Sequence, residues 1–546
     1  MTTTDNGLRF WGTPTLYNLA WHGALAEVAF DAAGIQACLL NLAYPCYIIR
    51  YNGQIGVTHA GSLYPAVNNE VETLLACPPI WPQQLGDPYF MSAYGVRYPY
   101  ATGAMANAIA SEELVIRLGR EQILASYGAA GAVPSRLEPA IQRIQAALPQ
   151  GPYAFNLIHS PNEDALERGA AELYVKHGVA NVEASAYLGL TPHVVYYRAA
   201  GLSLDQSGQI VTGHRIMAKL SRREVAIQFM QPAPEAMLRQ LVQQGRITEL
   251  QATLAQHVPI ADDVTVEADS GGHTDNRPLV GLLPSILALR DDIQAKYRYP
   301  MPIRVGAAGG ISTPASTLAA FSMGAGYVVT GSVNQSCVEA GTSPATRQLL
   351  AQADMTDVIM APAADMFEMG VKVQVLKRGT LFGMRAQKLY ELYRDYDSIE
   401  AIPTAEREKL EQQVLRRSMD AVWEETVAYF TQRDPAQIQR ANKDPKRKMA
   451  LIFRWYLGLS SRWANTGEKG READYQIWCG PAMGVFNEWV KGSYLEKPEN
   501  RSVADVAHHL MIGATYLNRL QQLRVAGLIL PVEFEQYRPN PLQSGS

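Results

Sequence analysis

Cysteine is scarce in this sequence, with 5 residues among 546, and none of them forms a Cys-x-x-Cys pair. An odd, scattered set argues against a disulfide framework and against a zinc ribbon, which needs cysteines paired at short spacing. The pattern therefore predicts free, buried thiols in a reducing compartment. The cysteines are Cys38, Cys46, Cys77, Cys337 and Cys479.

Long apolar runs and a strong charge imbalance are also absent. No stretch is long enough to cross a bilayer, and Met1–Arg9 is polar rather than signal-like. A formal net charge of −4 gives the chain no general attraction to nucleic acid or to an anionic membrane. We therefore expect a soluble, cytoplasmic protein in which any acidic partner binds a local patch.

Several cofactor and catalytic motifs are missing from the chain. It has no Gly-x-Gly-x-x-Gly after a strand, no Gly-x-x-x-x-Gly-Lys-Ser/Thr loop and no Gly-x-Ser-x-Gly elbow. It also has no His/Cys cluster at zinc spacing, so we expect no metal. A Rossmann domain is therefore not expected, and a bound nucleotide cofactor should be a mononucleotide rather than an intact dinucleotide.

The most informative segment present is residues 263–334, where three β-branched runs end in small residues. Their ends are Glu267–His273, Val305–Gly310 and Val328–Ser332. Small residues at a strand end let backbone N–H groups approach a phosphate or a ring closely. The intervals can each hold a helix, so the three ends should meet at the carboxyl rim of a parallel barrel, where we expect the chemistry.

Short strands alternate with helical stretches such as Leu137–Ala147 from Tyr98 onward, which is typical of an α/β protein. Eight strands with helical crossovers predict a (β/α)8 TIM barrel. A ninth apolar run, Val194–Tyr197, is interpreted as an insertion. The expected strands are Pro99–Thr102, Ile123–Tyr127, Tyr153–Ile158, Val182–Ala186, Arg215–Leu220, Val264–Ala268, Ile303–Ala307 and Tyr327–Thr330.

The chain divides into four expected regions. Residues 1–92 form a small N-terminal α+β unit, in which Asn52-Gly53 should close a hairpin. Residues 93–384 form the barrel. Residues 385–530 show helical periodicity and predict a helical subdomain, and residues 531–546 form a tail.

His273 is the first catalytic candidate, because two glycines precede it just past a strand end. An imidazole there can donate a proton or a hydrogen bond near neutral pH. An isolated histidine more often caps the following helix or bonds a loop carbonyl. The acidic strand end at Glu267 and the two later glycine turns favour the functional interpretation.

Two glycine turns are candidates for a phosphate site, Gly309–Ser312 and Thr330–Ser332. In many barrels the seventh and eighth loops bind phosphate through backbone N–H groups. The alternative is that Ser312 and Ser332 simply cap two helices without a ligand. The occurrence of both turns at consecutive strand ends favours a ligand.

Two further groups carry weaker signals. Gly103, Met105 and Asn156 follow or lie in early barrel strands and suit an aromatic ring, although ordinary packing explains Met105 equally well. The densest basic run, Lys443–Lys448, is either a solvated helix start or a dock for an acidic carrier protein and its phosphate-bearing arm.

Residues 267–273, with Ala308–Ile311 and Thr330–Ser332, resemble the superfamily of nitronate monooxygenases and FMN-dependent enoyl-acyl carrier protein reductases. Two longer segments, Ala364–Thr380 and Trp478–Trp489, look like the signature of PfaD-type enzymes. With the N-terminal unit, this resemblance extends over nearly the whole chain. PfaD-type proteins are trans-acting enoyl reductases that serve polyunsaturated fatty acid synthases and trans-acyltransferase polyketide synthases.

The resemblance implies a TIM barrel that holds FMN without a covalent bond, with His273 at the reaction centre and Lys219 near the flavin pyrimidine. One departure is Ala268, where the superfamily often has glycine; the extra methyl group should not abolish binding. The other implied flavin positions are Gly103, Met105, Asn156, Glu267, Ser270, Gly271 and Gly272 at the ring and ribityl chain, and Gly309, Gly310, Gly331 and Ser332 at the phosphate.

The reaction implied is reduction of an enoyl thioester on an acyl carrier protein, with NADPH or NADH as reductant and a proton supplied by His273 directly or through water. We favour polyketide biosynthesis as the pathway. The alternatives are a polyunsaturated fatty acid synthase reductase, a nitronate monooxygenase that reacts with oxygen, and an inactive scaffold for carrier domains. The sequence leaves open whether the protein forms a homodimer.

Overall fold

The computed structural model describes residues 6–11, 19–65, 71–159, 161 and 163–542. Its N-terminal unit packs helix α1 (Ala32–Leu40) with a sheet ordered β4–β3–β6. Strands β3 (Cys46–Tyr51) and β4 (Gln54–Thr58) pair antiparallel around Asn52-Gly53, which has positive φ at both residues, so the predicted hairpin is confirmed. The other strands are β1 (Arg9–Phe10), β2 (Leu19–His22), β5 (Ser62–Pro65) and β6 (Glu72–Cys77).

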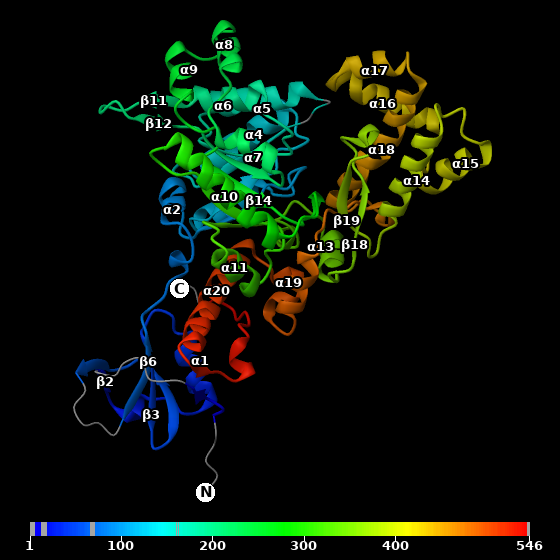
Figure 1. The fold of residues 1–546 in the computed structure, drawn as a ribbon. Helices are drawn as coiled ribbons and strands as arrows, with labels where there is room; N and C mark the ends of the chain where they lie inside the picture. Colours follow the sequence, from blue (N-terminus) through cyan, green and yellow to red (C-terminus); the bar gives the residue numbers. More distant parts are fainter. Residues whose placement is uncertain (1–5, 12–18, 66–70, 160, 162, 543–546) are drawn as a thin grey trace.

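Eight parallel strands close into a barrel in the middle of the chain, which confirms the predicted TIM-barrel fold (Figure 1). Every strand expected from the sequence overlaps one of these eight. Their bounds are β7 (Tyr100–Thr102), β8 (Leu124–Tyr127), β9 (Ala154–Ile158), β10 (Asn181–Ser185), β13 (Arg215–Leu220), β14 (Asp263–Glu267), β16 (Arg304–Ala308) and β17 (Val328–Thr330).

The apolar run Val194–Tyr197 is not an insertion, which corrects the sequence-based interpretation. It lies in helix α6 (Pro192–Ala200), the crossover between β10 and β13. The side chain of Thr191 caps the first turn and Pro192 occupies the first helical position, and these start signals outweigh the strand preference of the β-branched and aromatic residues. The segment that does protrude here is a hairpin of β11 (Leu202–Leu204) and β12 (Ile210–Thr212).

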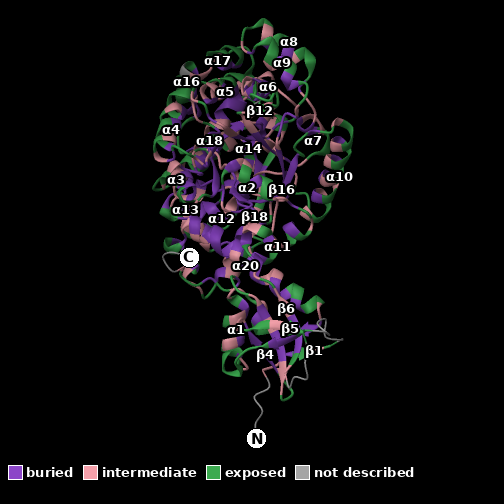
Figure 2. Cartoon of the chain, turned by 90° about the vertical axis from the view of Figure 1, so that its left-hand side faces the viewer, coloured by how far each residue is buried: buried purple, intermediate pink, exposed green. Residues whose placement is uncertain are grey.

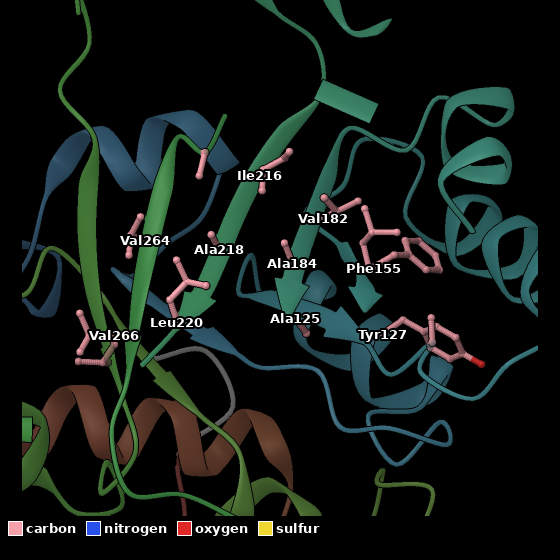
Figure 3. Packing of buried hydrophobic residues seen from close by; sticks show 14 of the residues in the cluster. Ala125, Tyr127, Phe155, Val182, Ala184, Ile216, Ala218, Leu220, Val264 and Val266 are labelled. Atoms are coloured by element: carbon pink, nitrogen blue, oxygen red, sulfur yellow. The ribbon is translucent and has the colours of Figure 1, made fainter. Parts of the chain in front are cut away.

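Side chains alternate between the two faces of the barrel strands. Val182 and Val266 belong to the apolar cluster between the strands and the surrounding helices (Figure 3). Glu183, Lys219 and Glu267 occupy positions of the opposite parity on β10, β13 and β14. Because successive side chains of a strand point to opposite faces, these three charged residues point to the barrel interior.

The amino-terminal end of the barrel is closed by helix α2 (Pro88–Tyr94). Phe90 stacks on Tyr327 with ring centroids 4.2 Å apart. The hydroxyl of Tyr94 donates to Asp263, which also accepts two bonds of 2.7 Å from Arg304. The open side of the barrel is therefore the carboxyl rim predicted from the glycine turns.

Helices surround the barrel in the usual alternating order. The predicted run Leu137–Ala147 lies in α4, and every connection from β7 to β17 includes at least one helix. The bounds are α3 (Glu112–Arg120), α4 (Pro134–Ala147), α5 (Asp164–Lys176), α7 (Arg223–Met230), α8 (Glu235–Gln243), α9 (Glu249–Ala255), α10 (Leu279–Tyr297), α11 (Pro314–Ser322) and, after β17, α12 (Ser332–Gln335).

The last barrel helix is α20 (Val503–Val525), which packs against α11 and α3 and so occupies the eighth helical place. Residues 336–502 are thus an excursion between β17 and α20, drawn in yellow-green to orange beside the barrel in Figure 1. Its helices are α13 (Pro344–Ala351), α14 (Phe382–Asp395), α15 (Thr404–Lys409), a π-helical turn (Leu410–Leu415), α16 (Met419–Arg433), α17 (Pro435–Ala441), α18 (Pro445–Thr466) and α19 (Ala482–Val490).

The excursion also contains two strands that the sequence did not predict, β18 (Val358–Pro362) and β19 (Lys372–Leu376). They form a hairpin that pairs with β15 (Gly272–His273), the short strand after β14. The excursion is therefore joined to the barrel rim by backbone pairing. The region boundaries expected at residues 92, 384 and 530 stay a prediction.

Helix α20 joins the barrel to the N-terminal unit, which lies below the barrel in Figure 2. Tyr516 and Leu520 share one apolar cluster with Ile35, Leu39 and Ile48. The five cysteines are free, as predicted, but only Cys46, Cys337 and Cys479 are buried; Cys38 and Cys77 are half-buried, which corrects the expectation that all five are buried. Within the described ranges, no helix combines the length and the apolarity that a bilayer crossing requires.

Candidate functional site

A charged trio lies inside the carboxyl end of the barrel. The ammonium of Lys219 lies 3.5 Å from a carboxylate oxygen of Glu183 and 3.4 Å from one of Glu267. Glu183 also accepts from the backbone N–H of Ala104 at 3.1 Å, and Ser270 donates to Glu267 at 3.3 Å. The trio links strands β10, β13 and β14 inside the barrel, and we call these three side chains the charged floor.

The charge state of this floor follows from its geometry. Burial acts to lower the pKa of Lys219, but the nearby carboxylates of Glu267 and Glu183 outweigh it and raise that pKa above its usual value. Lys219 is therefore cationic at neutral pH. A fixed cation beside two carboxylates can orient a polar ring edge by hydrogen bonds.

Four backbone N–H groups are free at two adjacent strand ends. They belong to Gly310, Ile311, Gly331 and Ser332, and among the residues that the structure describes no acceptor bonds any of them. Strands β16 and β17 are neighbours, so the two turns lie side by side. Free amides gathered in this way suit an anion such as a phosphate.

The space beside these amides is open. A Cβ atom built on Gly310 or on Gly331 would meet no atom of the described residues within 4 Å. Gly309, by contrast, is needed for close packing, because a Cβ there would lie 2.6 Å from the backbone carbon of Ala268. Gly309 and Gly310 both have positive φ, of 81° and 77°.

The two serines of these turns are not helix caps, which rules out a purely capping role for them. Thr313, not Ser312, caps α11, and the Ser312 hydroxyl is fully buried without a partner among the described residues. The hydroxyl of Ser332 accepts from the N–H of Gly480 at 3.2 Å. Neither serine is therefore the N-cap residue of α11 or α12.

His273 lies on β15 and pairs with a carboxylate from the excursion. Its Nε2 is 3.2 Å from Oδ1 of Asp365, and its side chain is 36% exposed. Burial of the ring acts to lower the pKa of His273, but Asp365 outweighs it and raises that pKa above its ordinary value. The pKa of Asp365 is lowered, because its hydrogen bond to His273 outweighs its own partial burial.

The excursion also packs directly on the glycines before His273. A Cβ on Gly271 would lie 2.8 Å from the backbone nitrogen of Cys479. Gln374 donates to Asp269 and to the carbonyl of Ser270, both at 2.8 Å. Burial raises the pKa of the Cys479 thiol to about 12, so this cysteine is a neutral packing group and not a nucleophile.

The structure gathers most of the predicted site residues at one rim. Lys219, Glu267, Ser270 and His273 come together there, as do the glycine turns of β16 and β17. Asn156 is 4% exposed, and its side-chain amide donates to the carbonyl of Glu183 and to the hydroxyl of Ser185. Met105 is partly buried and packs against the apolar cluster around the barrel. The roles assigned to all of these residues stay predictions.

Three site residues were not predicted from the sequence. Glu183 is a single acid inside a buried strand, which was the available signal. Asp365 and Gln374 lie in the segment Ala364–Thr380, which was noted for its resemblance but not as part of a site. The described residues hold no group of His, Cys, Asp and Glu side chains that could bind a metal ion.

The basic run Lys443–Lys448 forms the start of α18, where Asp444 caps the helix. Lys446 lies 3.1 Å from Asp397, and Arg447 donates to Gln437 at 2.7 Å. Within this run, Lys446 thus has a carboxylate partner and Arg447 has a neutral amide partner. Docking of a carrier protein on it stays a prediction.

Two protein families match parts of the chain. Residues 21–79 match the N-terminal domain of the fatty acid synthase subunit PfaD. Residues 396–475 match the inserted helical domain of [acyl-carrier-protein] S-malonyltransferase. The second match falls within the excursion, which is itself an insertion in the barrel.

Similar proteins include a polyunsaturated fatty acid synthase component of Thraustochytrium sp., 52% identical over 81% of this chain. The polyketide biosynthesis protein PksE of Bacillus subtilis is 44% identical over 81% of the chain. The chain spans 30% of the length of the first protein and 58% of the second.

One solved structure is similar to this chain over most of the length of both proteins. The enoyl reductase domain of MlnA, from the macrolactin biosynthesis cluster of Bacillus amyloliquefaciens, has 38% sequence identity and a TM-score of 0.77. The match covers 81% of this chain and 99% of that domain. The likeness therefore includes the barrel and much of the chain around it.

Proposed function

This chain belongs to the family of PfaD-type enoyl reductases, and we propose that it reduces the α,β-double bond of enoyl thioesters carried by acyl carrier proteins, with FMN as cofactor and NADPH or NADH as reductant. When bound, FMN supplies the hydride chemistry, because it accepts two electrons from the nicotinamide and passes them as hydride to the β carbon of the substrate. The proposal covers synthases of polyketides and of polyunsaturated fatty acids.

The observation that carries the cofactor proposal is the set of free amides at the ends of β16 and β17. Gly310, Ile311, Gly331 and Ser332 offer donors to a phosphate monoester, and the open space beside Gly310 and Gly331 leaves room for it. The buried, unpartnered hydroxyl of Ser312 adds a further polar atom to the same turn. These features fit the phosphate end of FMN.

The charged floor fits the polar edge of the flavin ring. Lys219 is a donor, and Glu183 and Glu267 are acceptors, so together they match the mixed donors and acceptors of a pyrimidine edge. Because these groups are held by one another, they cost little reorganisation when a ring binds. In this proposal the backbone of Gly271 and Gly272, in the segment after β14, would contact the same ring.

His273 completes the proposed reaction by supplying a proton. Its imidazole is paired with Asp365, which raises the pKa of His273, and it suits donation of a proton to the α carbon of the thioester as the hydride arrives at the β carbon. The substrate then gains one hydride and one proton, and the nicotinamide leaves oxidised. The histidine regains its proton from solvent, since the side chain is partly exposed.

The two pathways are distinguished by carrier protein rather than by the site. Identity to two fatty acid synthase components of Thraustochytrium sp. is 52% and 50%, against 44% for the polyketide protein PksE. This difference makes polyunsaturated fatty acid synthesis a second candidate beside the polyketide pathway. Turnover of crotonyl groups on carrier domains of each kind would decide between them.

An anaerobic absorption spectrum tests the function. The purified protein should show an oxidised flavin spectrum that NADPH bleaches and that a crotonyl-type thioester restores without oxygen. Oxygen uptake driven by a nitroalkane without NADPH, together with a reduced flavin that the thioester does not reoxidise, would instead indicate a nitronate monooxygenase. A colourless protein that takes up no FMN would refute the proposal and favour a scaffold.

A further inference from the structure

The carboxylate that pairs with His273 comes from outside the barrel. Asp365 is 92 residues further along the chain and lies between β18 and β19 of the excursion. A barrel alone would leave the imidazole without this partner. The excursion therefore contributes a charged group to the rim where the proposed reaction takes place.

Backbone pairing fixes this carboxylate relative to the histidine. In the ladder of β15 and β19, Gly272 faces Gln374 and His273 faces Val373. Gln374 also holds Asp269 and Ser270 by two bonds of 2.8 Å, so the loop before His273 is clamped to the strand after Asp365. The two residues are held in register from both sides.

The pairing leaves the second ring nitrogen of His273, Nδ1, available for a hydrogen bond to a ligand. Nε2 faces Asp365, and in the part of the chain that the structure describes Nδ1 has no hydrogen-bond partner. The other charged groups that act on the ring are Glu267 and Lys219 on the barrel strands, while Arg454 of α18 acts on Asp365. Of these groups, only Asp365 bonds the imidazole.

We infer that Asp365 is a positioning residue for the proposed reaction: it holds Nε2–H of His273 and keeps the ring cationic, so that Nδ1–H is presented to the substrate. This inference rests on the proposed function. The N–H bond at Nδ1 breaks and a C–H bond forms at the α carbon, while Nε2 keeps its proton against Asp365. The neutral ring then takes up a proton from solvent.

The sign of the pH dependence follows from the ion pair. Asp365 favours the protonated imidazole, so the pKa of His273 is raised and the donor form persists to higher pH. Substrate reduction should then be full below that pKa and fall as the pH rises through it. Removing the negative charge should move this fall to lower pH.

The experiment compares Asp365→Asn and Asp365→Glu with the wild-type protein. Asparagine can still accept from Nε2–H but lacks the charge, whereas glutamate keeps it. The pKa of His273 is measured in the full chain from the pH dependence of diethyl pyrocarbonate modification, followed by mass spectrometry. In parallel, rapid mixing measures how fast a crotonyl-type thioester reoxidises the reduced enzyme across pH 5.5 to 9.

For Asp365→Asn we expect the modification pKa and the alkaline limb of the rate profile to fall together by about one pH unit. Reoxidation at pH 8 should slow about 10-fold, with little change at pH 5.5, while reduction by NADPH stays within 2-fold. Asp365→Glu should restore most of the modification pKa of His273 and most of the reoxidation rate at pH 8. The control is Asp164→Asn, which removes the partner of His193 at 2.8 Å and should leave His273 unchanged.

Several outcomes would overturn the inference. One is a modification pKa that stays in place in Asp365→Asn, and another is a modification pKa that moves while the rate profile does not. A rate loss that is equal at every pH and is not rescued by glutamate would indicate a structural role only. A wild-type protein that no enoyl thioester reoxidises would refute the proposed function instead, and the modification pKa would still report on the ion pair.

Discussion

Glycine meets two different requirements at the barrel rim. At Gly271 and Gly309 a side chain would collide with backbone less than 3 Å away, so these glycines serve packing. At Gly310 and Gly331 there is open space, so the absence of a side chain serves access. The second pair is where substitutions should separate ligand binding from folding.

Gly310→Asp should expel the cofactor. Aspartate tolerates the positive φ of 77° at a modest cost, but its carboxylate would repel a phosphate held by the neighbouring amides. The control is Gly310→Asn, which has nearly the same size and the same tolerance of this backbone but no charge. Flavin absorbance per protein should fall more than 10-fold in the aspartate variant and much less in the asparagine variant. Full flavin content in Gly310→Asp would show that the phosphate does not bind beside Gly310.

His273→Ala should separate cofactor binding from proton transfer. The purified variant should keep its flavin and its reduction by NADPH, because the imidazole is not part of the free-amide turns. Reoxidation by an enoyl thioester should slow about 100-fold or more, the range typical for loss of a general acid. His177→Ala, which removes a histidine paired with Glu138 on the barrel exterior, is the matched control. Unchanged reoxidation in His273→Ala would refute the proposed role.

The residues that sequence reasoning found and missed differ in how local their signals are. The glycine turns and His273 stand beside strand ends, so a short window predicts their place. Glu183 interrupts an apolar strand by a single residue, which composition alone does not separate from an ordinary buried polar group. The pairing of His273 with Asp365 depends on the register of β15 with β19, and no local pattern encodes that register.

At the scale of elements, the short β-branched runs predicted the barrel strands because each is buried on both faces and bounded by small or turn residues. The strand-forming side chains of Val194–Tyr197 favour a strand, but Thr191 and Pro192 start a helix just before them, and helix α6 forms instead. Strands β18 and β19 are not predicted from the sequence because they lie outside the eight-stranded barrel and pair in a separate sheet with β15. The excursion they belong to could not be placed from sequence, since its partner strand is two residues long.

The contact between the excursion and the β14 loop predicts a sensitive glycine. Gly271→Ala would place a methyl group 2.8 Å from the backbone of Cys479, and neither backbone can move without breaking the Gln374 clamp. Overpacking of this kind costs about 1 to 3 kcal/mol, so the free energy of unfolding should fall by that amount, and flavin content should fall with it.

The control for this substitution is Gly281→Ala on helix α10, where a Cβ meets no atom within 4 Å in the part of the chain that the structure describes. That change should be neutral or stabilising by up to about 1 kcal/mol, because alanine favours a helix over glycine. Thermal unfolding followed by flavin release measures both variants. Equal behaviour of the two would show that the excursion does not press on the rim.

At the scale of the whole molecule, helix α20 is the element that all parts share. It fills the eighth helical place of the barrel, follows the excursion directly, and packs its second half on the N-terminal unit. Its Arg519 is 1% exposed and donates to backbone carbonyls of Asn41 at 3.0 Å, Leu42 at 3.1 Å and Tyr44 at 3.0 Å. These carbonyls lie just after the end of α1, where no further helical turn supplies N–H donors.

Arg519→Leu should therefore loosen the N-terminal unit without emptying the barrel. It leaves several buried carbonyls without donors, which costs about 3 kcal/mol or more in total. Limited proteolysis should cut first within residues 19–79, the thermal midpoint should fall, and flavin content and thioester-driven reoxidation should stay near wild type. Arg519→Lys keeps a cation with fewer directed donors and should be intermediate. If Arg519→Leu instead lost its flavin while the N-terminal unit resisted protease, the N-terminal unit and the barrel rim would be coupled through α20, and scaffold and site would not be separable in this molecule.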